Sequence, residues 1–193
     1  MSDGDCLILF RHAKSDWSCP GQSDFERGLS PRGRRDATKM GQWFTRQDIR
    51  PDCVLSSPSR RTSETLRHFG LGLSSGSLPP PIWEQKLYHA SAAAMLALLS
   101  EARCGRKVML VGHNPGLEEL LFKLVGAVAL PHAYQKPFPT GAIYVLALDG
   151  RLSEIRMRSA RVLLAQRPRA LDRTGIEKSR GSEASENCRR TRT

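Results

Sequence analysis

A short apolar run near the start of the chain constrains the fold more than any other sequence feature. Residues 6–10 are Cys-Leu-Ile-Leu-Phe, and Arg11 and His12 follow them directly. Such a run is typical of a strand that is buried on both faces of a parallel sheet. Because open α/β sheets bind ligands beyond the carboxyl ends of their strands, we expect Arg11 and His12 to lie at a binding edge.

Two later stretches repeat this pattern. Residues 107–111 form a second apolar run that leads to His113, and residues 53–56 form a third that leads to Arg60 and Arg61. The carboxyl ends of parallel strands lie at the same edge of a sheet. The sequence therefore predicts that polar groups from three distant parts of the chain meet at one place.

Helical patterns separate the apolar runs. Ser30-Pro31 and Ser57-Pro58 each combine a good N-cap residue with proline at the first helical position. Ser91 and Pro115 precede two further stretches with apolar residues at helical spacing. The expected strands are residues 6–10, 53–56, 107–111, 142–148 and 152–157, and the expected helices run to about residues 47, 69, 103 and 125.

The order of these elements predicts the fold class. Strands that alternate with helices indicate an α/β fold with a mostly parallel sheet between two helix layers, a three-layer α/β/α sandwich. The Asp-Gly pair at residues 149–150 predicts a hairpin that joins the last two strands. Residues 83–88 are compatible with a short strand or with a loop.

Charge is concentrated towards the end of the chain. The 193 residues suit one domain and carry a formal net charge of +11. Residues 158–193 hold ten Lys or Arg against four Asp or Glu, which is more than half of that excess. Residues 172–193 contain Ile176 as their one bulky aliphatic side chain. We expect a catalytic domain over residues 1–171 and a basic, disordered tail over residues 172–193.

The cysteines and the chain start bear on the compartment. The five cysteines are scattered, with no Cys-x-x-Cys pair, which favours a reducing compartment over a disulfide framework. No apolar segment is long enough to span a bilayer, and residues 1–5 do not have the composition of a secretory signal. A cytoplasmic location is therefore expected. The cysteines are Cys6, Cys19, Cys53, Cys104 and Cys188.

The motifs together resemble a known family. Arg11-His12-Ala13 resembles the Arg-His-Gly signature of the histidine phosphatase superfamily, the phosphoglycerate mutase-like group, with Ala13 in place of Gly. The run from Arg11 to Trp17 is similar to the SixA-type phosphohistidine phosphatase branch. The resemblance covers roughly residues 6–170, and it implies the fold of that family, a three-layer α/β/α sandwich. It continues through Asp24, Arg27, residues 29–33, Ser57-Pro58-x-x-Arg61 and residues 112–115.

This resemblance implies a mechanism and assigns roles. His12 would be a covalent nucleophile that becomes transiently phosphorylated, and His113 would flank the phosphate, as a cation in one reading. Arg11 and Arg61 would bind phosphate oxygens, for which a guanidinium is well shaped. The family spacing Ser-Pro-x-x-Arg selects Arg61 over Arg60. No metal or other cofactor is implied, and the sequence contains no carboxylate cluster typical of a magnesium site.

Two further residues are weaker candidates. The superfamily often supplies a carboxylate general acid from the region between its second and third motifs, and Glu84 is the candidate there. Ser18 stands where mutase-like members have Asn, so it is a candidate phosphate ligand or a simple polar loop residue. His68, His89 and His132 are interpreted as surface or satisfied core residues, and Trp83 and Tyr88 as packing. Asp24 and Arg27 are expected to form a structural ion pair.

Three functions remain open at this point. The first is a phosphatase for phosphohistidine in a protein such as a phosphorelay domain. The second is a small-molecule phosphomonoesterase or a mutase of the same superfamily. The third is polyanion binding, nucleic acid included, through the arginine-rich tail, which would be an accessory role because it leaves the motifs unexplained. The expected partner is thus a phosphorylated protein or small molecule, with no membrane.

Overall fold

The computed structural model describes residues 5–74, 76–126 and 137–172. Its helices and strands follow the predicted alternation closely. In chain order they are β1 (Cys6–Arg11), α1 (Pro31–Thr45), β2 (Cys53–Ser56), α2 (Arg60–Leu71), β3 (Ile82–Trp83), the 3-10 turn η1 (Gln85–Leu87), α3 (Ala92–Glu101), β4 (Lys107–Gly112), α4 (Gly116–Val125), β5 (Ile143–Leu148), the 3-10 turn η3 (Leu152–Glu154) and β6 (Ala160–Gln166).

The strands form one six-stranded sheet with the order β3-β2-β4-β1-β5-β6. β1 and β2 both pair with β4 in parallel, and β3 adds in parallel to β2. β5 pairs antiparallel with β1, and β6 pairs antiparallel with β5. The sheet is therefore mixed but mostly parallel, and the predicted α/β/α class is confirmed.

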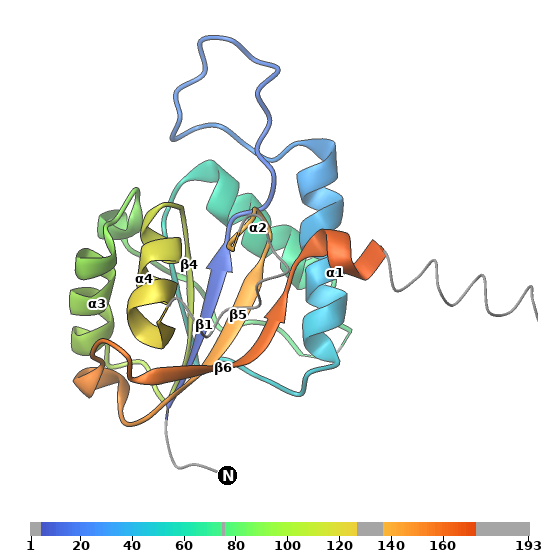
Figure 1. Ribbon diagram of the computed structural model, residues 1–193. Helices are drawn as coiled ribbons and strands as arrows, with labels where there is room; N and C mark the ends of the chain where they lie inside the picture. Colours follow the sequence, from blue (N-terminus) through green and yellow to red (C-terminus); the bar gives the residue numbers. More distant parts are fainter. Residues whose placement is uncertain (1–4, 75, 127–136, 173–193) are drawn as a thin grey trace, which may run out of the picture.

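Alternating side chains of β1 supply both faces of the core, because successive strand residues point to opposite sides. Leu7 and Leu9 pack on the side of α3 and α4, whereas Ile8 and Phe10 pack on the side of α1 and α2. Figure 1 shows the two helix pairs on opposite sides of the sheet, with the loop between β1 and α1 above it. This loop rises from the carboxyl end of β1, where Arg11 and His12 lie.

Ser30 and Ser91 cap their helices as predicted, but the second helix starts later than expected. Each of the two hydroxyls accepts a backbone N–H three residues ahead. α2 begins at Arg60 rather than at Pro58, and Ser59 is its N-cap residue. The backbone N–H of Arg60, in the first turn of α2, donates to the carbonyl of Phe25 in the loop between β1 and α1. This N–H is therefore not available to bind an anion.

The predicted hairpin strand at residues 152–157 is wrong. Leu152 is 3% exposed and begins a 3-10 turn, and its N–H donates to the carboxylate of Asp5. The strand that pairs with β5 is β6, which begins at Ala160. Because Leu152 is buried in the core beside α3, the chain cannot turn back at residues 149–150.

The predicted tail lies outside the described residues, apart from Asp172. That carboxylate pairs with Lys39 on α1. Within residues 5–74, 76–126 and 137–172, no helix combines the length and the apolar composition that a bilayer crossing requires.

Candidate active site

The strand register brings the two motif histidines together. Arg11 and Gly112 are partners at the carboxyl ends of β1 and β4, so His12 and His113 leave neighbouring strands at the same level. The N–H of His12 donates to the carbonyl of Gly112 at 3.1 Å. The two imidazole centroids are 5.1 Å apart. The predicted convergence at this edge of the sheet is therefore found in the structure.

An open cleft of about 240 Å³ lies over these strand ends. Its walls come from five segments: the β1 end and its following loop, the start of α2, the turn after η1, the β4 end and the segment before β5. The lining residues are Arg11, His12, Lys14, Ser15, Trp17, Asp24, Arg27, Arg61, His89, His113, Asn114 and Thr140.

His12 is held as a neutral imidazole, and one of its nitrogens has no hydrogen-bond partner among the described residues. It is 8% exposed, and its Nδ1 lies 2.8 Å from the carbonyl oxygen of Ala13. A carbonyl only accepts hydrogen bonds, so Nδ1 carries the hydrogen and Nε2 keeps its lone pair. Burial, helped by the charges of Arg61 and Arg11, lowers the pKa of His12 to about 3.

Gly141 fixes the backbone on which His12 stands. Its N–H is shared between the carbonyls of Arg11 and His12, at 3.2 and 3.0 Å. Its φ of +78° lies in the left-handed region, and a Cβ there would meet Pro168 at 2.9 Å. Glycine is therefore suited to this position for two independent reasons.

His113 is also neutral, but both of its ring nitrogens are engaged. Its Nδ1 accepts the Nε–H of Arg61 at 3.2 Å, so the hydrogen lies on Nε2, which donates to Ser57 Oγ at 2.9 Å. Burial, followed by the nearby His12 and Arg61, lowers the pKa of His113 to about 2. The expected cationic form of His113 does not fit this arrangement. The Ser57 hydroxyl orients His113 and does not cap α2.

Asp24 anchors Arg61 from the opposite side. The Arg61 Nη1 donates to the Asp24 carbonyl, and Nη2 donates to Asp24 Oδ2 at 2.8 Å. The predicted pair of Asp24 with Arg27 is present, at 2.8 Å. Burial would raise the pKa of Asp24, but hydrogen bonds from Tyr88 and His89 and the charge of Arg61 outweigh it and hold that pKa well below its usual range. Asp24 is thus a carboxylate that positions the cleft.

Arg11 lines the cleft and has one unpaired donor, which is buried. Its Nη1 donates to the carbonyl of Phe138 at 2.6 Å. Its buried Nε has no hydrogen-bond partner among the described residues. Burial lowers the pKa of Arg11, although a guanidinium remains charged at any physiological pH. A buried cationic N–H without a partner is costly unless an anion satisfies it.

Two of the weaker sequence candidates do not line the cleft. The Glu84 carboxylate accepts the N–H of Lys86 and caps η1, and Ser18 is exposed with its N–H donated to Asp16. Ala13, which replaces the family glycine, is fully buried against Leu29 and Ala37. Its methyl group is therefore not among the groups that narrow the cleft.

The sequence did not reveal the contribution of the segment after η1. The Tyr88 hydroxyl donates to Asp24 at 2.7 Å, and His89 Nε2 lies 3.0 Å from the same carboxylate. His89, predicted to be a surface or core residue, lines the cleft. Trp83, predicted to pack, is 48% exposed on β3. His68 lies beside Arg67 on α2, and His132 is outside the described residues.

Exposed aromatic and cationic groups mark the mouth of the cleft. Trp17 is 69% exposed, and the guanidinium of Arg27 lies 3.5 Å above its ring centroid. Lys14 also lines the cleft and is exposed. A planar ring under a guanidinium is a stable surface for stacking.

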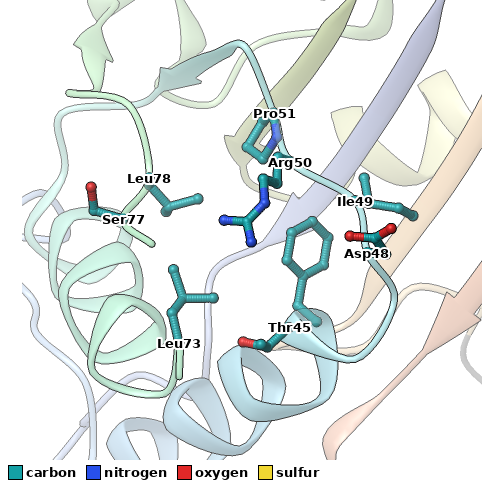
Figure 2. Close-up of a pocket in the computed structure, with 9 residues that line it drawn as sticks. Thr45, Asp48, Ile49, Arg50, Pro51, Leu73, Ser77 and Leu78 are labelled. Carbon is teal, nitrogen blue, oxygen red and sulfur yellow. The ribbon is translucent and has the colours of Figure 1, made fainter. Parts of the chain in front are cut away.

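A second, smaller pocket lies away from the strand ends, between the C-terminal end of α1 and the loop after α2. It measures about 40 Å³, and Figure 2 shows Arg50 pointing into it beside Leu73 and Leu78. It has room for only a few water molecules and contains no histidine or cysteine. It therefore offers none of the chemistry of the larger cleft.

No group of three or more His, Cys, Asp or Glu side chains is arranged to hold a metal ion within the described part of the chain. The charged groups at the cleft are instead mainly cationic, with Asp24 as the paired exception. Such a set of donors is suited to an anion with several oxygen atoms.

Comparisons with known proteins agree with this geometry. Residues 7–87 match the model of the histidine phosphatase superfamily, branch 1. An uncharacterized protein of Mycobacterium tuberculosis is 30% identical over 152 residues, which are 75% of this chain and 90% of that protein.

Solved structures extend the likeness to the fold. A protein from Agrobacterium tumefaciens, provisionally named phosphohistidine phosphatase SixA, superposes with a TM-score of 0.71 at 28% identity, over 84% of this chain and 97% of that chain. A protein of the same provisional name from Nakamurella multipartitia has a TM-score of 0.68 at 26% identity, over 86% and 96% of the two chains.

Proposed function

Since the chain belongs to the histidine phosphatase superfamily, we propose that it is a metal-independent phosphatase that forms a phosphohistidine intermediate on His12. The family and the fold support phosphatase activity. The covalent step and the residue roles are inferred from the site described above.

The state of His12 carries this proposal. A nucleophile for phosphorus needs a lone pair that is available at neutral pH and aimed into the site. The Nδ1–H of His12 is donated to Ala13, which leaves Nε2 as the free nitrogen of a ring that lines the cleft. Since the pKa of His12 is about 3, no deprotonation step is required before attack.

The charged groups around His12 have complementary roles. Phosphoryl transfer spreads negative charge over the non-bridging oxygens, and fixed donors stabilise that charge. The guanidinium groups of Arg11 and Arg61, which both line the cleft, supply such donors, and His113 keeps Arg61 in place through its Nδ1. The Nε2–P bond forms as the leaving group departs, and water then attacks phosphorus, breaks that bond and releases phosphate.

For the substrate class, we favour phosphohistidine on a protein. Two solved relatives with the provisional name phosphohistidine phosphatase SixA support this choice. The open cleft, with Trp17 and Lys14 exposed at its mouth, suits a phosphorylated side chain on a larger molecule. We also favour a cytoplasmic location, because Cys6, Cys19, Cys53 and Cys104 are free thiols.

A direct competition of substrates tests the proposal. The purified chain is incubated in EDTA with a phosphohistidine-bearing phosphorelay domain and, separately, with small phosphomonoesters, and inorganic phosphate is measured. Preference for the phosphohistidine domain is the expected result. Preference for the monoesters would keep the His12 chemistry but transfer the assignment to a small-molecule phosphatase. Transfer of phosphate between acceptors without its release would identify a mutase.

A further inference from the structure

A third imidazole lies at the outer side of the cleft. The ring of His89 stacks on that of His113, with centroids 5.3 Å apart and planes 29° from parallel. His113 thus lies between two neighbours in contact with it, the buried ring of His12 and the ring of His89, whose side chain is 52% exposed. An in-line displacement places the leaving group opposite the nucleophile, so an exposed residue that lines the same cleft is a candidate to contact it.

The backbone holds His89 there by two features. Its φ is +51°, in the left-handed region that few residues other than Gly, Asn, Asp and His adopt readily. The segment also packs directly on the first turn of α4. A Cβ atom on Gly116 would lie only 1.9 Å from the carbonyl oxygen of Ala90, so the close approach requires glycine there. A strained conformation next to a candidate active site indicates a constraint on the side chain.

We propose that His89, oriented by Asp24, is the general acid that protonates the leaving group. This rests on the proposed phosphatase activity. His89 Nε2 lies 3.0 Å from Asp24 Oδ2, so Nε2 is occupied by the carboxylate and Nδ1, on the other side of the ring, is the nitrogen that would deliver the proton. An imidazole held by a carboxylate is a common arrangement for proton transfer.

The neighbouring groups do not offer this proton. Tyr88 donates its hydroxyl hydrogen to Asp24, and His113 donates its Nε2 hydrogen to Ser57. Glu84, the acid expected from the sequence, caps η1 and does not line the cleft. The charged and titratable groups that face His89 are Asp24, Tyr88 and His113, with Arg61 bound to the same carboxylate.

The proton balance is complete over the two steps. In the first step the bond from phosphorus to the leaving atom breaks, the bond from His12 Nε2 to phosphorus forms, and the His89 proton passes to the leaving atom. In the second step water attacks phosphorus, the N–P bond breaks, and the water proton returns to His89. The products are the protonated leaving group and inorganic phosphate, and both histidines end as they began.

The dependence of the rate on the leaving group tests the proposal. His89→Asn is the variant, because Asn tolerates a positive φ and can still bond to Asp24 but cannot deliver a proton at neutral pH. For ethyl phosphate, whose leaving group is strongly basic, we expect kcat/KM to fall by about 100-fold or more. For 4-nitrophenyl phosphate, which needs no acid, we expect a loss within about threefold.

The pH profile gives a second reading. The alkaline fall of kcat/KM for ethyl phosphate, where the donor loses its proton, should disappear in His89→Asn. His68→Asn, on the outer part of α2, is the matched control and should match the wild type on both substrates. Equal losses of His89→Asn on the two substrates, or an unchanged pH profile, would show a structural role and overturn the proposal.

Failure of the His89 assignment can be distinguished from failure of the proposed phosphatase mechanism. If the wild-type chain releases phosphate from neither ester nor from a phosphohistidine domain, or if His12→Ala keeps its activity, the proposed phosphatase mechanism fails. If the wild type is active through His12 and acts on the esters, but His89→Asn shows no leaving-group dependence, the His89 assignment alone fails. A wild type that hydrolyses only the phosphohistidine domain overturns the expected ester losses and with them a role for His89 in protonating oxygen leaving groups.

Discussion

The ends of β1 and β4 present the same residue type in two different states. His12 and His113 follow paired residues, and both are buried and neutral. In His12, Nδ1 donates to the carbonyl of Ala13, and Nε2 has no hydrogen-bond partner among the described residues. In His113, Nδ1 accepts a hydrogen bond from Arg61 and Nε2 donates one to Ser57. In the mechanism that we propose, equivalent positions on neighbouring strands therefore supply a nucleophile in one case and a positioning group in the other.

The comparison indicates that the two histidines differ in their hydrogen-bond partners and not in their location in the sheet. Burial lowers the pKa of each, so neither differs from the other in charge. What differs is the acceptor nitrogen of each ring: Nδ1 of His113 accepts the Nε–H of Arg61, whereas Nε2 of His12 accepts no hydrogen bond from the described residues. A neutral imidazole has one donor and one acceptor, and only an unused acceptor can attack phosphorus.

The largest effect is expected at His12. In His12→Ala, kcat/KM should fall by about 10⁴-fold or more, because no covalent intermediate can form. Phosphate release measured at saturating and limiting substrate checks this value. A near-native thermal unfolding curve is the control that the fold has survived. Activity within tenfold of the wild type would show that the two histidines are not divided in this way.

His113 should matter less. His113→Gln keeps an amide that can bond to both Ser57 and Arg61, so we expect a loss of about 10-fold to 100-fold in kcat, as when one positioned donor is disturbed. Phosphorylated enzyme should still form in this variant, since His12 is intact. A quenched-flow measurement of acid-labile phosphate on the protein distinguishes the two roles. Complete loss of the phosphoenzyme in His113→Gln would make His113 the nucleophile.

The pH dependence of stability should reflect both rings. The unfolded chain protonates each histidine near pH 6.5, but the folded chain does so only at about 3 for His12 and about 2 for His113. Their contribution is therefore complete above about pH 6.5 and is lost as the pH falls towards 3. Each should lower the free energy of unfolding by up to about 1.4 kcal/mol per pH unit in that window.

Urea unfolding between pH 7 and pH 4 measures this slope. Replacing either histidine by a residue that does not titrate should reduce the slope of the unfolding free energy against pH by the contribution of about one bound proton. His113→Gln is the suitable variant, because it keeps hydrogen-bonding groups in the buried site. An unchanged slope in this variant would mean that His113 is already protonated in the folded chain at those pH values, which would contradict its neutral state.

The smallest effects are expected outside the cleft. Glu84→Gln and Ser18→Ala should each keep activity within about twofold, because neither side chain lines the cleft. Initial rates on an alkyl phosphate measure this best, since such a substrate depends most on a general acid. A loss of 100-fold in Glu84→Gln would reinstate the acid that the sequence resemblance suggested and remove the need for His89.

The sequence was sufficient for the features that depend on strand ends. His12, His113 and Arg61 each follow an apolar run, and parallel pairing must bring such residues to one edge. Helix starts at Ser30 and Ser91 were predictable because a cap is a local interaction. The α/β/α class follows from the same alternation of elements.

Features that depend on distant contacts were not predictable. His89 meets Asp24 across 65 positions of sequence, and no local pattern marks that contact. α2 starts at Arg60, and the predicted cap residue Ser57 instead bonds to the distant His113. The hairpin at residues 149–150 failed because Leu152 is buried in the core and its N–H is bound to Asp5. In each case a tertiary interaction overrides a local preference.

The most direct test of the central claim is to trap the intermediate. The enzyme is mixed with a radiolabelled phosphorylated substrate in EDTA, quenched within one turnover, and mapped by peptide analysis. We predict an acid-labile, alkali-stable phosphate on the peptide that contains His12, and its absence in His12→Ala. Release of phosphate with no label on His12, or a label on His113 instead, would contradict the account.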